Sequence, residues 1–250
     1  MDLGIKGRTA LVMAASKGIG RGIAEALARE GARVAISSRS ADSLRATAEG
    51  IAGEVHSFPA DTGDLERLRR LPDEVAEALG PIEILIANTG GPPGGGALDN
   101  SLAEWEAAFR SLVLATRVLV ERVLPGMRER GWGRIVNVGS SSIREPIPGL
   151  ALSNANRLAA LGFLETLADE VAAEGITVNT VATGMFATER LADREGSLEG
   201  AEAAAAQRVP ARRLGRPEEY GDLVAFLCSE RAAYLTGAVI PLDGGMLRSL

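Results

Sequence analysis

Short apolar runs alternate with longer amphipathic stretches along the whole chain, and this alternation constrains the fold more than any other feature. The predicted strands are residues 8–13, 33–37, 55–59, 82–87, 134–138, 176–181 and 238–242. The predicted helices are residues 20–30, 41–52, 65–79, 102–130, 151–174 and 217–229. Strands and helices in this order form a parallel sheet with helices on both faces. We therefore expect one α/β domain over residues 1–250, built on a doubly wound parallel sheet of about seven strands.

Prolines and one long connection add specific expectations. Pro72 predicts a kink or break in the helix at 65–79, because proline lacks a backbone N–H. Pro125 and Gly126 predict an interruption of the helix at 102–130. The connection at 183–216 is long and rich in Ala, Glu and Arg, and we expect it to act as a lid beyond the carboxyl edge of the sheet.

Composition excludes several classes of protein. The hydrophobic fraction of 46% can fill a large core, and a net charge of −6 argues against a nucleic-acid partner. The single cysteine can form no internal disulfide, which suits a reducing cytoplasm. The lone His56, with no second histidine and no cysteine pair, does not indicate a metal site. We therefore expect no bound metal. No apolar run is long enough to span a membrane, so we also expect a soluble, cytoplasmic protein.

A turn containing two glycines follows the first predicted strand. Residues 13–20 read Met-Ala-Ala-Ser-Lys-Gly-Ile-Gly and lead into the first helix. Backbone N–H groups and the helix dipole at such a turn favour anions, and this order is typical of Rossmann-type dinucleotide sites. The residues expected to bind the cofactor here are Ala14, Ser16, Lys17, Gly18, Ile19 and Gly20.

Motifs over nearly the full length resemble those of the short-chain dehydrogenase/reductase family. Residues 13–20 resemble its Thr-Gly-x-x-x-Gly-x-Gly motif, with Met and Ala at the first two positions. The segments Ala-Asn-Thr-Gly (87–90), Asn-Thr-Val-Ala-Thr-Gly (179–184), Leu-Gly-Arg-Pro-Glu-Glu (214–219) and Leu-Asp-Gly-Gly (242–245) resemble further family motifs. In the second of these, Thr183 replaces a proline. The resemblance predicts the fold more strongly than any single motif does.

The resemblance also implies roles for residues outside the glycine turn. It places Asp61 at the adenine, Asn88 and Gly90 beside the cofactor, and Thr188 at the nicotinamide carboxamide. It further implies a homo-oligomer, a tetramer or dimer, with the helices at 102–123 and 151–173 packed between subunits. At Ala14 we expect an ordinary backbone conformation, with the Cβ near the cofactor phosphates.

The end of the second predicted strand favours NADP(H) over NAD(H). An acidic residue at this position would bind ribose hydroxyls and repel a 2′-phosphate. Here Ser38 occupies the position and Arg39 follows it, while Lys17 lies in the glycine turn. Two cations that flank the adenosine ribose would bind the 2′-phosphate through charge-assisted hydrogen bonds. Alternatively, both are ordinary solvated charges.

At the catalytic position the chain departs from the family pattern. The family uses a tyrosine as proton donor, a lysine four residues later, a serine and an asparagine. Ser140 matches the serine, but residues 153–157 read Ser-Asn-Ala-Asn-Arg, so Ser153 and Arg157 replace tyrosine and lysine. Leu112 stands at the asparagine position. We expect Ser140, Ser153 and Arg157 to form a non-standard site, with the guanidinium able to hold the cofactor but not to titrate. The other interpretation of Ser153 is a helix residue without a chemical role.

The sequence therefore leaves three functions open. The resemblance extends to a branch with Ser-Asn-x-x-Arg that is labelled 3-oxoacyl-carrier-protein reductase, a label that rests on analogy of fold. The first function is NADP(H)-dependent reduction of a ketone, a small-molecule carbonyl compound or a 3-oxoacyl thioester. The second is a sensor or scaffold that binds NADP(H) without turnover. The third is a different reaction, such as a dehydration. We favour the first.

Overall fold

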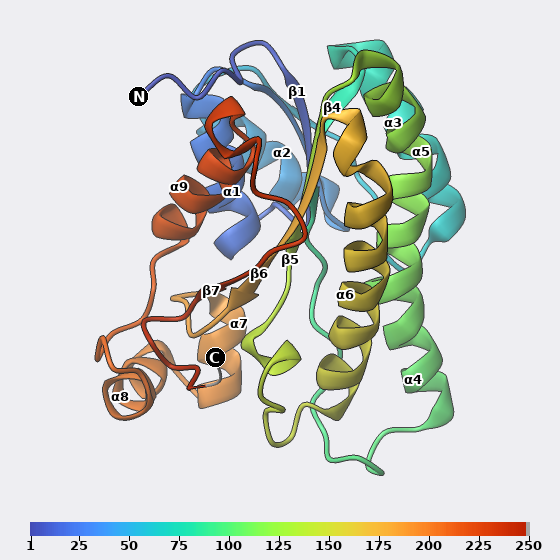
Figure 1. Cartoon of the computed structure of the whole chain (residues 1–250). Coiled ribbons are helices and arrows are strands. Elements are labelled where there is room, and N and C mark those ends of the chain that lie inside the picture. Colours follow the sequence, from blue (N-terminus) through green and yellow to red (C-terminus); the bar gives the residue numbers. More distant parts are fainter. Residues whose placement is uncertain (249–250) are drawn as a thin grey trace.

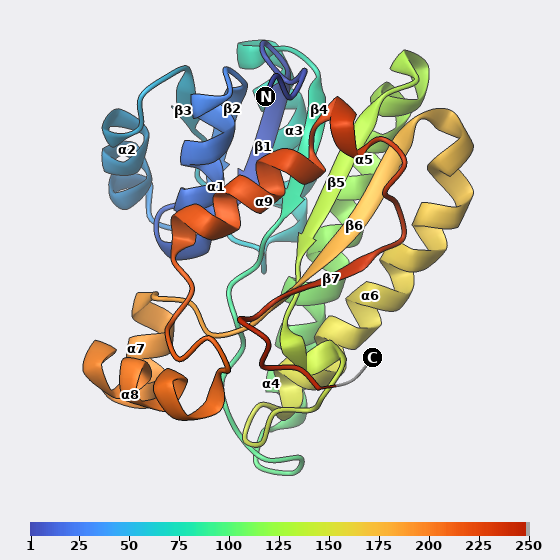
Figure 2. The ribbon, with the colours of Figure 1, turned by 60° about the vertical axis from the view of Figure 1, so that its left-hand side comes forward.

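Seven parallel strands pair into one sheet in a computed structural model that describes residues 1–248. Their order in the sheet is β3-β2-β1-β4-β5-β6-β7 (Figures 1 and 2). The strands are β1 (Thr9–Met13), β2 (Arg33–Ser37), β3 (Val55–Ser57), β4 (Ile82–Ala87), β5 (Gly133–Val138), β6 (Ile176–Thr183) and β7 (Val239–Leu242). The order reverses direction between β1 and β4, as in a doubly wound Rossmann-type sheet. The expected fold class is confirmed.

Helices cover both faces of the sheet, because buried parallel strands present apolar side chains to both sides. Three lie on one face: α1 (Gly18–Arg29), α2 (Ala41–Gly50) and α9 (Pro217–Leu227) (Figure 1). Three others lie on the opposite face: α3 (Leu65–Leu79), α5 (Ala115–Arg130) and α6 (Ala151–Val171). Within β1, Ala10 and Val12 pack under the first set and Leu11 and Met13 under the second. Because successive side chains of a strand point to opposite faces of the sheet, one strand contributes to both cores.

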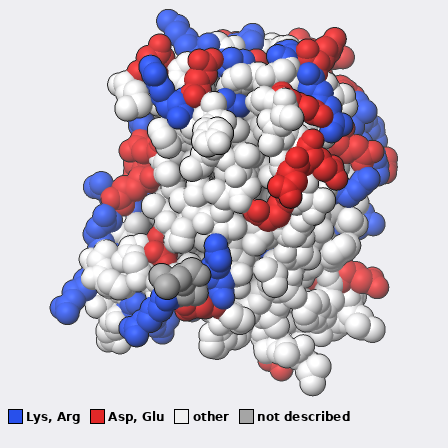
Figure 3. Space-filling model, viewed as in Figure 1, with Lys and Arg blue, Asp and Glu red and all other residues white. Residues whose placement is uncertain are grey.

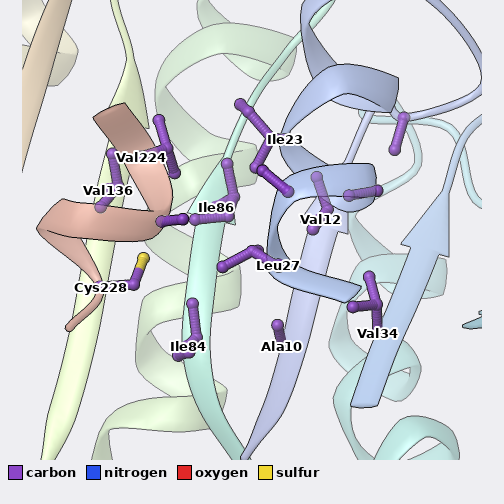
Figure 4. Packing of buried hydrophobic residues seen from close by; sticks show 14 of the residues in the cluster. Ala10, Val12, Ile23, Leu27, Val34, Ile84, Ile86, Val136, Val224 and Cys228 are labelled. Carbon is purple, nitrogen blue, oxygen red and sulfur yellow. The ribbon is translucent and has the colours of Figure 1, made fainter. Parts of the chain in front are cut away.

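Glycines allow α1 and α9 to approach each other closely over the first core (Figure 4). A Cβ on Gly22 would lie 2.4 Å from the Pro217 carbonyl oxygen, and one on Gly221 would lie 2.2 Å from the Gly22 carbonyl oxygen. Cys228 follows α9 and is fully buried among the apolar side chains shown there. Burial raises the pKa of its thiol to about 12, so it acts as a small packing residue rather than a nucleophile.

Neither helix breaks at its proline. α3 continues through Pro72 and α5 continues through Pro125. Pro125 is exposed, so the carbonyl that loses its helical partner can face water. The irregularity lies earlier: α4 (Leu102–Phe109) passes into the π-turn η1 (Arg110–Leu114), and the Ala115 N–H donates to the Arg110 carbonyl before α5 begins. The long helix therefore departs from α-helical geometry at Arg110–Leu114 and not at its proline.

The segment 183–216 extends beyond the carboxyl ends of the strands and contains α7 (Glu189–Glu195) and α8 (Leu198–Arg208) (Figure 2). Met185, Leu191, Ala201 and Leu214 give it a small core of its own. It therefore lies over the edge of the sheet at which the predicted site residues are found. Within residues 1–248, no helix has both the length and the apolar composition to cross a membrane.

Candidate functional site

The predicted site residues gather at the carboxyl edge of the sheet. The turn at 13–20 follows β1, Asn88 follows β4, Ser140 follows β5 and Thr188 comes after β6. These strands are neighbours in the order β1-β4-β5-β6, so the four segments after them lie side by side. The gap between β1 and β4 is the switch point of the sheet, where doubly wound folds bind their ligands.

The turn after β1 is built around close backbone contacts. Gly18 has φ +55°, a left-handed conformation that glycine adopts without strain. A Cβ on Gly20 would lie 2.3 Å from the Ala14 carbonyl oxygen, so only glycine fits at the start of α1. The Asn88 side-chain amide donates to that same carbonyl at 3.3 Å and joins the turn to the end of β4. Ile19 is half-buried and packs against the first core.

Ala14 does not have the ordinary backbone conformation expected from the sequence. Its φ is +48°, in the left-handed region that is costly for a residue with a Cβ. The next N–H, that of Ala15, donates to the Ser37 carbonyl of β2 at 3.0 Å. The chain must turn sharply here to leave β1 and still reach β2, so tertiary structure imposes the conformation on alanine.

Replacing Ala14 with glycine should therefore stabilise the protein. We expect Ala14→Gly to raise the free energy of unfolding by about 1 kcal/mol, or roughly 2–4 °C in Tm, because relief of strain exceeds the added chain entropy. Ala15→Gly is the matched control: Ala15 is fully buried, so losing its methyl group should lower Tm. Thermal unfolding followed by circular dichroism measures both. An unchanged or lower Tm for Ala14→Gly would contradict the strain argument.

The end of β2 holds polar groups without partners. The side-chain hydroxyls of Ser37 and Ser38 are buried and unbonded, and Arg39, which is exposed, has no ion pair within residues 1–248. Buried polar groups in proteins are usually hydrogen-bonded, whereas these two hydroxyls at a predicted ligand site lack a partner within the described residues. Asp61, four residues after the end of β3, is exposed, and its carboxylate accepts the Gly63 N–H at 2.8 Å.

Lys17, unlike Arg39, forms an ion pair within the part of the chain that the structure describes. Its ammonium forms an ion pair with Glu189 at the start of α7, which ties the β1 turn to the segment 183–216. The carbonyl of Ser16 accepts a hydrogen bond from the Thr47 hydroxyl at 2.8 Å, so the turn is also attached to α2. The pair of cations expected from the sequence thus contains one paired residue, Lys17, and one unpaired residue, Arg39.

Thr188 and Gly90 complete the predicted set. The Thr188 hydroxyl accepts the Leu191 N–H at 3.3 Å and caps α7. A Cβ on Gly18 would come within 3.2 Å of the Thr188 methyl carbon, so the start of α7 lies directly against the β1 turn. Gly90 is exposed, and a Cβ on it would meet nothing within 4 Å. Its backbone therefore borders open space.

Ser153 and Arg157 form one hydrogen-bonded unit with the end of β5. Both lie in α6, one turn apart, and the Arg157 Nε donates to the Ser153 Oγ at 3.2 Å. The Arg157 Nη1 donates to the Val138 carbonyl at 2.8 Å. Ser140 comes two residues after Val138, and its Oγ accepts the Ser142 N–H at 3.1 Å. The three residues predicted to be catalytic are therefore held together at the carboxyl end of β5.

The Arg157 guanidinium remains a cation in this position. Burial, together with the neighbouring charge of Arg190, lowers the pKa of Arg157 to about 10, which is still well above neutral pH. The guanidinium can therefore donate hydrogen bonds and attract negative charge, but it cannot relay a proton at neutral pH.

Sequence reasoning missed two other side chains at this edge. Tyr220 in α9 is fully buried, and its Oη shares a hydrogen bond of 2.9 Å with the Thr183 Oγ1 at the end of β6. Burial raises the pKa of Tyr220. The sequence held a signal for this contact, because Thr183 stands where the family motif has a proline and introduces a hydroxyl that needs a hydrogen-bond partner. Arg190 in α7 donates from Nη1 to the Gly91 carbonyl at 3.0 Å and from Nη2 to the Pro92 carbonyl at 3.1 Å.

Comparison with known proteins identifies the family. The sequence matches the family described as enoyl-(acyl carrier protein) reductase over residues 13–247. It is 34% identical over 248 residues to human dehydrogenase/reductase SDR family member 4, covering 95% of this chain and 87% of the relative. The chain belongs to the short-chain dehydrogenase/reductase family.

Two further relatives of the short-chain dehydrogenase/reductase family match over the full length. The 3-oxoacyl-[acyl-carrier-protein] reductase of Aquifex aeolicus is 32% identical over 250 residues, covering 98% of this chain and 100% of the relative. The crystal structure of L-sorbose reductase from Gluconobacter frateurii, complexed with NADPH and L-sorbose, superposes with a TM-score of 0.95 at 31% identity and full coverage of both chains. These short-chain dehydrogenase/reductase proteins are similar to this chain in both sequence and fold.

Proposed function

We propose that the protein is an oxidoreductase that reduces a ketone with NADP(H), using a non-standard active site. The observation that carries the proposal is the unit of Ser153, Arg157 and the end of β5, next to Ser140 and beside the switch point of the sheet. L-sorbose reductase, which is bound to NADPH and a sugar in its crystal structure, has the same fold throughout. The 3-oxoacyl reductase relative makes a 3-oxoacyl thioester a second substrate class within the same chemistry.

The residues of the chain divide the work of this reaction. A bound reduced nicotinamide would supply the hydride. Ser140 donates a hydrogen bond to the carbonyl oxygen of the substrate, and Arg157 holds the cofactor and stabilises negative charge that develops on that oxygen. Ser153, already hydrogen-bonded to Arg157, would hold a water molecule that protonates this oxygen; the hydroxide left behind, stabilised by the Arg157 guanidinium, regains a proton from solvent when the product leaves. The segment 183–216 acts as the lid that excludes bulk water.

The β1 turn and the end of β2 fit the cofactor. Gly18, Ile19 and Gly20 present backbone N–H groups at the start of α1, where a diphosphate binds. The unbonded hydroxyl of Ser38 and the unpaired guanidinium of Arg39 are donors for a 2′-phosphate. Asn88, Gly90, Asp61 and Thr188 would line the rest of the site. We therefore propose NADP(H) rather than NAD(H).

Ser38→Asp should reverse this preference. The new carboxylate would accept hydrogen bonds from the ribose hydroxyls of NADH and repel a 2′-phosphate, so NADPH affinity should fall by about 10- to 100-fold while NADH affinity rises. Arg39→Gln is the companion variant, which should weaken NADPH alone. Titration monitored by nicotinamide fluorescence measures both. Equal affinities for NADPH and NADH in the unaltered protein would contradict the preference.

The decisive test of the function is the same titration followed by a screen of ketones. Tight NADPH binding together with NADPH oxidation on adding a ketone supports the reductase. If neither nucleotide binds, both the reductase and a nucleotide sensor are wrong. NADPH binding without turnover on any ketone favours the second candidate, a non-catalytic NADP(H) sensor or scaffold. That candidate is supported by Ser153, because an aliphatic hydroxyl is a far weaker acid than a tyrosine phenol.

We further propose that the protein is a homo-oligomer. A groove between α4 and α6 is lined by Trp105, Phe109 and Ala159, and Phe109 and Leu158 are 44% and 53% exposed. The face in Figure 3 is also largely uncharged over its middle, with charged side chains at its margins. Exposed large apolar side chains such as Phe109 and Leu158, grouped beside an apolar groove, are usually covered by a partner. Sedimentation velocity should give a dimer or tetramer, and a monomer at micromolar concentration would refute the proposal.

A further inference from the structure

The start of α7 crosses the opening of the site. Lys17, after β1, pairs with Glu189, and Gly91 and Pro92, after β4, accept hydrogen bonds from Arg190. α7 itself belongs to the chain that leaves β6. Since β1, β4, β5 and β6 are consecutive in the sheet, a segment that starts beyond β6 and reaches the ends of β4 and β1 must pass over the end of β5. Burial, and after it the nearby charge of Arg190, lower the pKa of Arg157, so Arg190 lies on the same side of the sheet edge as the unit formed by Ser153 and Arg157.

Both arginines have N–H groups to spare. A guanidinium carries five N–H donors. Arg190 uses one on each terminal nitrogen, both for backbone carbonyls, and its Nε has no partner among residues 1–248. Arg157 uses Nε and Nη1, which leaves both N–H groups of its Nη2 without a partner in the same part of the chain. These unused donors are available to a ligand.

No carboxylate balances the two charges within the described residues. Neither guanidinium forms an ion pair there, since all contacts of Arg157 and Arg190 are to a hydroxyl or to backbone carbonyls. Glu189 is occupied by Lys17. Asp243, the buried acid after β7, accepts the N–H groups of Gly245 and Leu247. The proximity of the two arginines also lowers the pKa of Arg157.

We propose that the site takes a ketone that carries a carboxylate, with Arg190 as the residue that selects for the charge. A keto acid would place its carbonyl at Ser140 and its carboxylate under Arg190, whose planar fork matches a carboxylate. Arg157 adds a second positive charge at the floor of the site. The proposal rests on the proposed ketone reductase and specifies its substrate class.

The test compares acetoacetate with its methyl ester, which differs from it by one methyl group and by the loss of the negative charge. Each is titrated calorimetrically into protein saturated with NADP⁺, so that no hydride transfer occurs, and into protein without nucleotide. We expect acetoacetate to bind about tenfold or more tightly than the ester, the effect of one charge-assisted hydrogen-bonded pair. Because binding is measured without turnover, a failure of catalysis and a failure of charge selection give different results.

Variants assign the selection to Arg190. Arg190→Gln should remove the preference for acetoacetate, leave binding of the ester unchanged and leave NADPH affinity unchanged. Arg190→Lys should restore part of the preference, since it keeps the charge but not the fork. Arg208→Gln is the matched control: it lies in the neighbouring helix α8 and pairs with Glu195, and it should have no effect.

Three results would overturn the proposal. The first is equal affinity of the unaltered protein for acetoacetate and the ester. The second is no binding of either ligand in the presence or absence of NADP⁺. The third is a parallel loss of NADPH and acetoacetate affinity in Arg190→Gln, which would assign Arg190 to the cofactor diphosphate.

Discussion

The paired substitution Ser153→Tyr with Arg157→Lys is expected to raise kcat for ketone reduction by about 100-fold or more. A phenol positioned as general acid contributes roughly 10²- to 10⁴-fold, which the aliphatic hydroxyl of Ser153 cannot supply. The two changes are needed together. Arg157 is fixed on Ser153 and on the Val138 carbonyl, and a lysine releases both contacts and leaves space for the aromatic ring.

Two control variants separate the effect of the phenolic proton from the effects of side-chain shape and of losing Arg157. Ser153→Phe with Arg157→Lys has almost the same shape as the active pair but no phenolic proton, so it should bind NADPH and remain at the basal rate. Ser153→Tyr alone should gain little, because Arg157 still occupies the end of β5. Steady-state rates of NADPH oxidation with saturating ketone measure all of them. If the Tyr/Lys variant binds NADPH with unchanged affinity and stays inactive, the missing acid is not what limits this site.

Adding a side chain between α1 and α9 is expected to produce the largest loss of stability. Gly22→Ala would place a Cβ 2.4 Å from a backbone carbonyl oxygen of α9. Gly221→Ala would place one 2.2 Å from a backbone carbonyl oxygen of α1. Neither oxygen can move without separating the helices, so we expect each variant to lose about 3 kcal/mol, or roughly 6–12 °C in Tm. Both helices cover the core under the β1 turn, so NADPH affinity should fall as well.

Gly50→Ala is the control for the effect of the substitution itself. Gly50 is the last residue of α2, where the nearest atom to a Cβ would be the Arg21 Nη2 at 3.9 Å, an ordinary contact, so alanine should cost no stability there. Differential scanning calorimetry of the three variants gives the comparison. A Tm for Gly22→Ala or Gly221→Ala that is no lower than that of the unaltered protein would show that the α1–α9 contact is looser than described.

Much of the fold was predictable because its signals are local. The strands at 33–37 and 82–87 and the helix at 65–79 agree with the structure to the residue. A buried parallel strand is a short continuous apolar run, and a helix that covers it has an apolar stripe with a period of 3.6 residues. Both patterns fit in a window of about 5–15 residues, so they can be read without knowing what packs against them. Their alternation then permits few topologies.

The candidate site was predictable to the extent that it is made of segments that follow strands. The turn at 13–20, Asn88 and Ser140 each come directly after a strand, and the carboxyl ends of parallel strands lie at one edge. Gly18 and Gly20 could be assigned from residue type alone, since glycine adopts such turns without strain. Types of residue and their order along the chain were therefore sufficient to bring the predicted residues to one place.

What the sequence determined by itself is the set of elements, their doubly wound order and the edge at which the site lies. Only the tertiary structure decided the left-handed backbone of Ala14, the pairing of Lys17 with Glu189, the hydrogen bond between Thr183 and Tyr220, and the hydrogen bond from Arg190 to the Gly91 carbonyl. Each of these depends on where a distant segment lies, and the three contacts join residues 37 to 172 positions apart. Local periodicity carries no information about such pairs, because their distance is set by the sheet order and by the path of the connections across its edge.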